Sequence, residues 1–158
     1  MFSKGDYMNF ISGLLGNPLF LAPALAWFLA QLIKTILYLI INKDLRLERM
    51  FGSGGMPSSH SATVTALVVV TAFKYGVSGF EFPMALFFAI VVMHDAMGVR
   101  RETGKQAVVI KSLAEELQRI NGGDFSSMDA LKEFVGHTPL QVAAGAFLGF
   151  LVGILISL

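Results

Sequence analysis

The chain has 158 residues, of which 54% are hydrophobic and only 15% charged, with a formal net charge of +1 and no cysteine. A soluble domain carries about a quarter charged residues, so this composition indicates a membrane protein, and the length indicates a single domain over residues 1–158. The small net charge and the lack of a basic stripe with aromatics exclude a nucleic-acid partner, and without cysteine neither a disulfide framework nor a thiolate metal site can form.

Four apolar segments are predicted to cross a bilayer, whose hydrocarbon core needs roughly 20 helical residues. They are residues 18–41, 59–75, 82–98 and 139–158, and the second and third have only 17 residues each. Helix tilt or local thinning of the bilayer is therefore expected around these two. The amino-terminal residues lack the basic region and cleavage site of a signal peptide, so residues 1–17 are expected to form a short interfacial piece.

Basic residues are distributed unevenly between the two sides of this topology. The loops at residues 42–58 and 99–138 hold nine lysines and arginines, and the opposite side holds only Lys4 and Lys74. The nine are Lys43, Arg46, Arg49, Arg100, Arg101, Lys105, Lys111, Arg119 and Lys132. The positive-inside rule then places these loops in the cytoplasm and both termini outside. We expect an integral protein of a bacterial cell membrane.

The long loop has helical signals of its own. Apolar residues recur at helical spacing over residues 105–121, and Asn121-Gly122-Gly123 is a plausible stop. A second, short helix is predicted over residues 128–135. Residues 99–138 are thus expected to form a cytosolic helical insert, and the whole chain an all-α, polytopic membrane helical bundle with about four spans.

The segment Pro57-Ser58-Ser59-His60 is the most informative part of the sequence for chemistry, because it opens the second apolar segment. Proline is favourable at a helix start, and the free N–H groups there make a site for anions such as phosphate. A histidine at the same place can donate or accept a proton. The alternative is a capped helix whose histidine only satisfies a buried hydrogen bond.

Two blocks of sequence resemble the type 2 phosphatidic acid phosphatase superfamily. Pro57-Ser58-Ser59-His60 is similar to its Pro-Ser-Gly-His motif, with Ser59 in place of glycine. Residues 137–149 resemble its last motif, in which a histidine precedes an Ala-Gly-Ala-rich helix. The overall plan is similar to a small divergent branch described as acid phosphatase or vanadium-dependent haloperoxidase-related.

The resemblance implies a mechanism and a substrate class. His137 matches the histidine that attacks phosphorus, and His60 matches the histidine that protonates the departing oxygen. The implied reaction is hydrolysis of a lipid phosphomonoester or an isoprenyl pyrophosphate, without a cofactor. The residues expected to bind the substrate phosphate are Lys34, Lys43, Arg49, Ser58, Ser59, Arg100 and Arg101.

The cationic residues depart from the superfamily pattern. Its first motif is a lysine, six residues and Arg-Pro, whereas five residues separate Lys43 from Arg49 and Met50 follows. Lys34 is the other candidate, because a lysine inside a membrane helix is expensive and usually functional; the alternative is a snorkelling side chain. Arg100 and Arg101 stand in for the arginine that normally precedes the nucleophile, and positive-inside charge competes as their explanation.

The carboxylate that normally orients the nucleophilic histidine is missing, because its position holds Gln141. Thr138-Pro139-Leu140-Gln141 also fits a helix capping box. Asp95 is the candidate replacement, from the third span, with a neutralised ion cluster as the equal alternative. Adjacent His94 and Asp95 point to different faces of a helix, so no metal site is predicted.

The rival function is a non-catalytic anionic-lipid-binding or assembly protein, and a homo-oligomer is possible for either.

Overall fold

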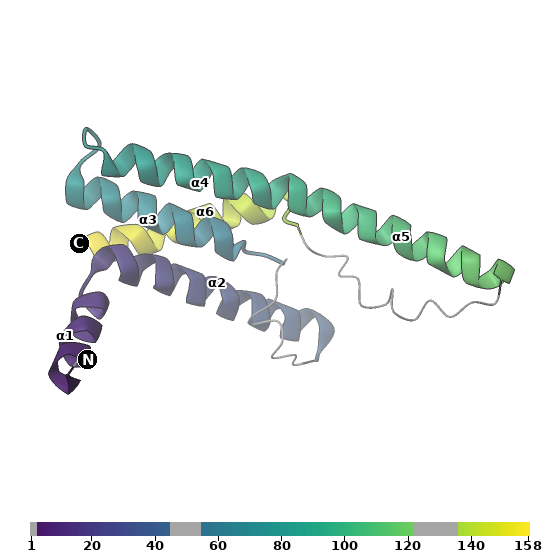
Figure 1. Cartoon of the computed structure of the whole chain (residues 1–158), viewed down its shortest axis with the longest axis horizontal. Helices are drawn as coiled ribbons and strands as arrows, with labels where there is room; N and C mark the ends of the chain where they lie inside the picture. The colour runs from purple at the N-terminus through teal and green to yellow at the C-terminus, as the bar shows by residue number, and fades with distance from the viewer. Residues whose placement is uncertain (1–2, 45–54, 122–135) are drawn as a thin grey trace.

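The regular structure of the chain is helical throughout the part that a computed structural model describes, residues 3–44, 55–121 and 136–158 (Figure 1). The helices are α1 (Lys4–Leu15), α2 (Pro18–Asn42), α3 (Ser59–Tyr75), α4 (Glu81–Met97), α5 (Val99–Asn121) and α6 (Pro139–Ser157). The predicted all-α membrane bundle is confirmed. The predicted short helix at residues 128–135 lies outside the described residues.

Three helical stretches in the described residues are long and apolar enough to cross a membrane. They are α2, the stretch Glu81–Ile120 that joins α4 to α5, and α6. The helix α3 has 17 residues and begins with the polar sequence Ser-His-Ser, so the predicted number of four spans is approximate. Even so, α3 packs against α2, α4 and α6 and lies at the centre of the bundle.

Small residues make this central position possible. Gly145 and Gly149 of α6 lie directly on the backbone of α3 at Ser58 and Ala62, where a Cβ atom on either glycine would overlap carbonyl oxygens. Alanines of α2 also pack on α3. The buried core they share with α6 holds Ala22, Ala26, Ala30, Ala62, Ala66, Val70 and Val152. Close backbone approach through small residues is the usual way to pack helices in a bilayer, where apolar side chains gain little by leaving lipid.

The connections place the two predicted motifs at one end of the bundle. In Figure 1, α2 and α4 run toward the end where α3 and α6 begin, and α1 and the carboxyl terminus lie at the other end. The sequence motifs at residues 57–60 and 137–141 therefore share an end although about 77 residues separate their histidines. The fold brings the two blocks of the resemblance together.

The helix α5 differs from its predicted form. We expected a helix from residue 105, but α5 begins at Val99, separated from α4 only by Gly98. It continues away from the bundle beyond the end of α4 (Figure 1). The residues between 99 and 105 are mostly good helix formers, among them Arg100, Arg101 and Glu102, so Gly104 does not stop the helix.

Candidate functional site

Two histidines from opposite halves of the sequence meet at the shared end of α3 and α6. Nδ1 of His60 lies 3.4 Å from Nε2 of His137. The ring centroids are 5.6 Å apart and the ring planes are inclined by 65°, an edge-on arrangement. His60 is the second residue of α3, and His137 directly precedes Thr138, the N-cap of α6.

His137 is held firmly and its side chain is 1% exposed. Its backbone N–H donates to the carbonyl of Ala96 at 2.9 Å, which ties the segment before α6 to the last turn of α4. Its Nδ1 lies 3.3 Å from Oε1 of Gln141. The backbone N–H of Thr138 donates to the same oxygen at 3.0 Å, so the atom facing the imidazole is the amide oxygen, an acceptor.

This arrangement assigns the tautomer of His137. Since Oε1 of Gln141 can only accept, Nδ1 of His137 carries a hydrogen, and in the neutral ring Nε2 therefore keeps a lone pair. In turn, Nδ1 of His60 is the donor across the 3.4 Å contact between the rings. Gln141 is therefore both the second half of the predicted capping box, which the structure confirms, and the group that orients the imidazole. A carboxylate at this place orients in the same way and adds charge.

Hydrogen bonds also lock the start of α3 to the start of α6. The backbone N–H of Ser58 donates to the carbonyl of Gln141 at 2.9 Å. The hydroxyl oxygen of Ser58 accepts from the backbone N–H of Ser61 at 3.3 Å and from its hydroxyl at 3.1 Å. Ser58 and Ser61 are fully buried, and Ser59 nearly so. The polar groups of Ser58 are thus engaged within the protein, and they fix the position of His60.

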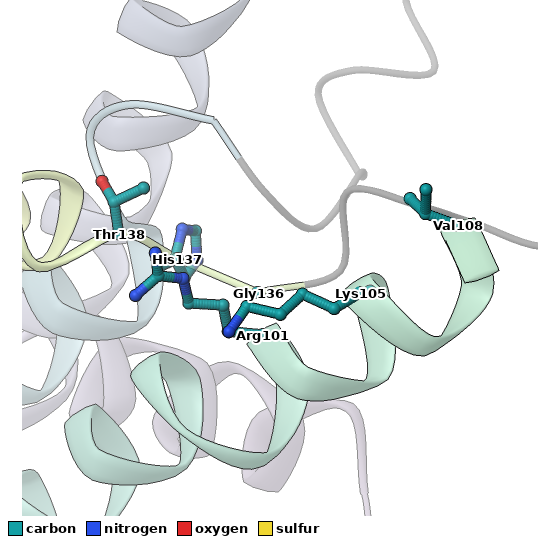
Figure 2. Close-up of a pocket in the computed structure, with 7 residues that line it drawn as sticks. Arg101, Lys105, Val108, Gly136, His137 and Thr138 are labelled. Atoms are coloured by element: carbon teal, nitrogen blue, oxygen red, sulfur yellow. The ribbon is translucent and has the colours of Figure 1, made fainter.

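An open pocket of about 210 Å³ adjoins His137. Its lining includes Arg101 and Lys105 of α5, together with Gly136 and Thr138 (Figure 2). Gly136 lies against the backbone of Arg101, where a side chain on the glycine would overlap. Arg101 is exposed and shares the pocket with the buried imidazole. An anion in this pocket would meet a planar set of guanidinium donors, which suit phosphate.

Lys34 supplies a second cation near the start of α3. The side chain of this lysine is 6% exposed, and its Nζ donates to Oε1 of Gln31 at 2.6 Å. The alkyl stem packs on Gly55, whose φ of +86° favours glycine and whose missing side chain leaves room for the lysine. Lys43, by contrast, is exposed at the end of α2, nine residues further along and about 13 Å away at the usual helical rise.

The structure gives less detail for the remaining predicted site residues. Asp95 is half-buried in the last turn of α4, next to the residue whose carbonyl holds His137. The backbone of Arg100 lies in the first turn of α5, and Arg49 lies outside the described residues. Within residues 3–44, 55–121 and 136–158, no group of three or more His, Asp or Glu side chains is arranged to hold a metal ion.

Sequence reasoning missed two residues that shape the site. Gln31 bonds the amino group of Lys34, and its signal was a second polar residue one helical turn from a lysine in an otherwise apolar segment. Gly55 accommodates the lysine stem, and its signal was only that it precedes the Pro-Ser-Ser-His segment. Both residues act through Lys34, which its position inside a predicted membrane helix had singled out.

Comparison with known proteins identifies the family of this chain. Residues 15–152 match the Divergent PAP2 family. The chain is 39% identical over 153 residues to the uncharacterized membrane protein YuiD of Bacillus subtilis (strain 168), an alignment that covers 92% of this chain and 94% of that protein. No solved structure matches the chain. The resemblance carried by the two histidine blocks is thus confirmed: the chain belongs to the Divergent PAP2 family.

Proposed function

We propose that this protein is a membrane phosphatase that hydrolyses a lipid phosphomonoester or an isoprenyl pyrophosphate through a histidine nucleophile. The observation that carries the proposal is the 3.4 Å contact between His60 and His137. One imidazole is buried with a lone pair on the facing nitrogen, and the other presents a hydrogen. A nucleophile and a proton donor are the two groups that phosphoryl transfer through an enzyme intermediate requires.

The proposed first step forms a bond between Nε2 of His137 and phosphorus while the bond to the leaving oxygen breaks. His60, protonated on both ring nitrogens as the imidazolium, gives one proton to that oxygen and becomes a neutral imidazole. In the second step water attacks the phosphohistidine, His60 takes a proton from the water, and phosphate leaves with His137 restored. The two rings stand too close to enclose a phosphoryl group, so His60, which is half-buried, swings away when substrate enters.

Two cations near the starts of α3 and α6 would hold the non-bridging oxygens. Arg101 shares the pocket with His137, and Lys34 lies against Gly55, five residues before His60 in sequence. Developing negative charge on a phosphoryl group is best met by cations already in place. We assign Lys34 and Arg101 the leading phosphate-binding roles, with Arg100, Arg49, Lys43 and Ser59 as supporting candidates. Ser58, which was also expected to bind phosphate, is fully buried with its hydroxyl engaged by Ser61, so we assign it the positioning of His60 instead.

The proposed substrate is a lipid because the site lies where membrane-spanning helices end. A headgroup that diffuses in the bilayer reaches this level without leaving the membrane. We place the site on the cytoplasmic face of a bacterial cell membrane from the nine-to-two distribution of basic residues. A cysteine introduced at Ser112 should then be protected from an impermeant thiol reagent in intact cells, and ready labelling would reverse the orientation.

Phosphate release by the purified protein tests the activity. The panel is phosphatidate, an isoprenyl pyrophosphate and a soluble phosphomonoester, each with and without EDTA and vanadate. We expect release from the lipids, insensitivity to EDTA and competitive inhibition by vanadate, which adopts a five-coordinate geometry similar to the transition state. Release that survives in His137→Ala, or that EDTA abolishes, would contradict the histidine mechanism.

A second candidate function is non-catalytic binding of anionic lipids. Gln141 favours it, because an amide at the position of the superfamily's aspartate orients the imidazole without stabilising its positive charge. This alternative predicts that lipid phosphates bind at the site and that none is hydrolysed. The same panel separates the two functions when binding and release are measured together.

A further inference from the structure

An apolar groove runs between α2 and α3 on the membrane part of the bundle. Its volume is about 320 Å³, and its lining includes Phe20, Ala24 and Trp27 of α2 with Thr63 and Leu67 of α3. The hydroxyl of Thr63 donates to the carbonyl of Ser59 at 2.7 Å, so it is satisfied within its own helix. Phe20 and Trp27 are each 40% exposed, and they border a groove that is open along the side of the bundle.

Helical spacing puts each wall of the groove in line with residues of the polar site. On α3, Thr63 and Leu67 stand three and seven residues after His60, and this spacing puts all three on one stripe of the helix. On α2, Gln31 and Lys34 stand four and seven residues after Trp27, so they extend the stripe that carries the aromatic residues. Each wall is therefore apolar along the membrane and ends in a polar residue of the candidate site.

We propose that this groove holds a hydrocarbon chain of a lipid phosphate whose headgroup lies at His60 and Lys34. The proposal rests on the proposed function for the identity of the headgroup. A phosphorylated lipid has an anionic headgroup and an apolar chain, and these match the cationic end and the apolar part of the groove. The apolar trough fits a hydrocarbon chain, and the buried lysine at its polar end selects the anion.

The only tryptophan of the chain gives a direct readout, because it lines the groove. Bromine on an acyl chain quenches indole fluorescence at contact. The full-length protein is reconstituted in phosphatidylcholine vesicles with a small fraction of brominated phosphatidate, brominated phosphatidylglycerol or brominated phosphatidylcholine. We expect phosphatidate to quench Trp27 at several-fold lower mole fraction than the other two, in the parent and in His137→Ala, where turnover is blocked. Lys34→Met should remove this preference.

Equal quenching by the three brominated lipids would overturn the proposal, because Trp27 would then contact only the bulk lipid of the bilayer. Equal quenching by phosphatidate and phosphatidylglycerol would also overturn it, because the site would then bind any anionic lipid. Selective quenching without phosphate release would leave the groove standing and contradict the phosphatase. Phosphate release without selective quenching would support the phosphatase and contradict the chain-binding groove.

A matched pair of substitutions tests the groove through activity. Leu67→Trp fills the groove, and Leu151→Trp makes the same change on α6 at a position that is 48% exposed. We expect Leu67→Trp to lower kcat/KM for long-chain phosphatidate at least tenfold and to change kcat/KM for a soluble phosphomonoester less than twofold. Leu151→Trp should alter neither. A parallel loss on both substrates in Leu67→Trp would place the damage at the headgroup site and contradict a chain-binding groove.

Discussion

The starts of α3 and α6 are built from the same parts and use them differently. Each start has a hydroxyl N-cap, Ser58 or Thr138, and a histidine within two residues of it. In α6 the histidine precedes the cap, is 1% exposed and is bonded through Gln141. In α3 the histidine follows the cap, inside the helix, and is half-buried. The difference separates a fixed imidazole from one with room to turn.

That difference fits a division of labour between the histidines. A nucleophile benefits from a fixed position and a set tautomer, because geometry near the reacting atom accounts for much of the rate. A proton donor must follow the leaving oxygen and then turn to water, so some freedom is useful. We infer that the buried ring of His137 attacks and that the looser ring of His60 transfers protons.

Removal of the fixed ring should have the largest effect. His137→Ala deletes the attacking atom, so hydrolysis of lipid phosphate should fall to background. In the parent, an acid-labile phosphohistidine should form at His137 during turnover and be detectable by mass spectrometry after a rapid quench. Phosphorylation found at His60 instead would reverse the assigned roles.

Removal of the looser ring, that of His60, should cause a severe but incomplete loss of activity. His60→Ala should reduce turnover by roughly 10²-fold or more, the usual scale for loss of a general acid. A substrate with a good leaving group, such as a nitrophenyl ester, needs less protonation and should lose less. If both kinds of substrate lose activity equally, His60 positions the substrate and does not transfer the proton.

The candidate carboxylate of Asp95, whose neighbour Ala96 accepts a hydrogen bond from the backbone of His137, gives the next effect. Asp95→Asn should lower turnover about tenfold, since a carboxylate near an attacking imidazole stabilises the positive charge that develops on it. Gln141→Asp, added to Asp95→Asn, should restore part of the loss, because position 141 already bonds Nδ1 of His137. Rescue should be partial, as aspartate is shorter than glutamine. Full activity in Asp95→Asn would remove this carboxylate from the mechanism.

Much of the fold was predictable because its signals are local. Apolar runs marked the membrane helices, and Thr138 with Gln141 marked a capping box that the structure contains. The start of α5 was placed too late, since Gly98 and Gly104 look like breaks in sequence and only one interrupts the helix. Glycine weakens a helix by about 1 kcal/mol relative to alanine, which its neighbours can offset.

The two histidines of the site were predictable from the sequence, but the residues that contact them were not. The motif blocks pointed to His60 and His137, but their contact depends on packing between α3 and α6, which no local pattern encodes. The role of Gln141 as the partner of the imidazole depends likewise on which rotamer the folded site allows. Gly55 and Gln31 were missed because their function is defined by Lys34, a residue distant in sequence from the former.

The smallest predicted effect concerns the N-cap of α3. Ser58→Ala removes the acceptor for the N–H of Ser61 and should lower the free energy of unfolding by about 1 kcal/mol, the usual cost of losing a cap. Ser3→Ala is the control, because Ser3 also caps a helix, α1, but is exposed. The control should leave the denaturation midpoint of the bundle unchanged in detergent.

Activity in Ser58→Ala should fall only a few-fold, since the bond from its backbone N–H to Gln141 survives and still joins the two helix starts. A loss as large as that of His60→Ala would show that the hydroxyl of Ser58 itself contacts the substrate.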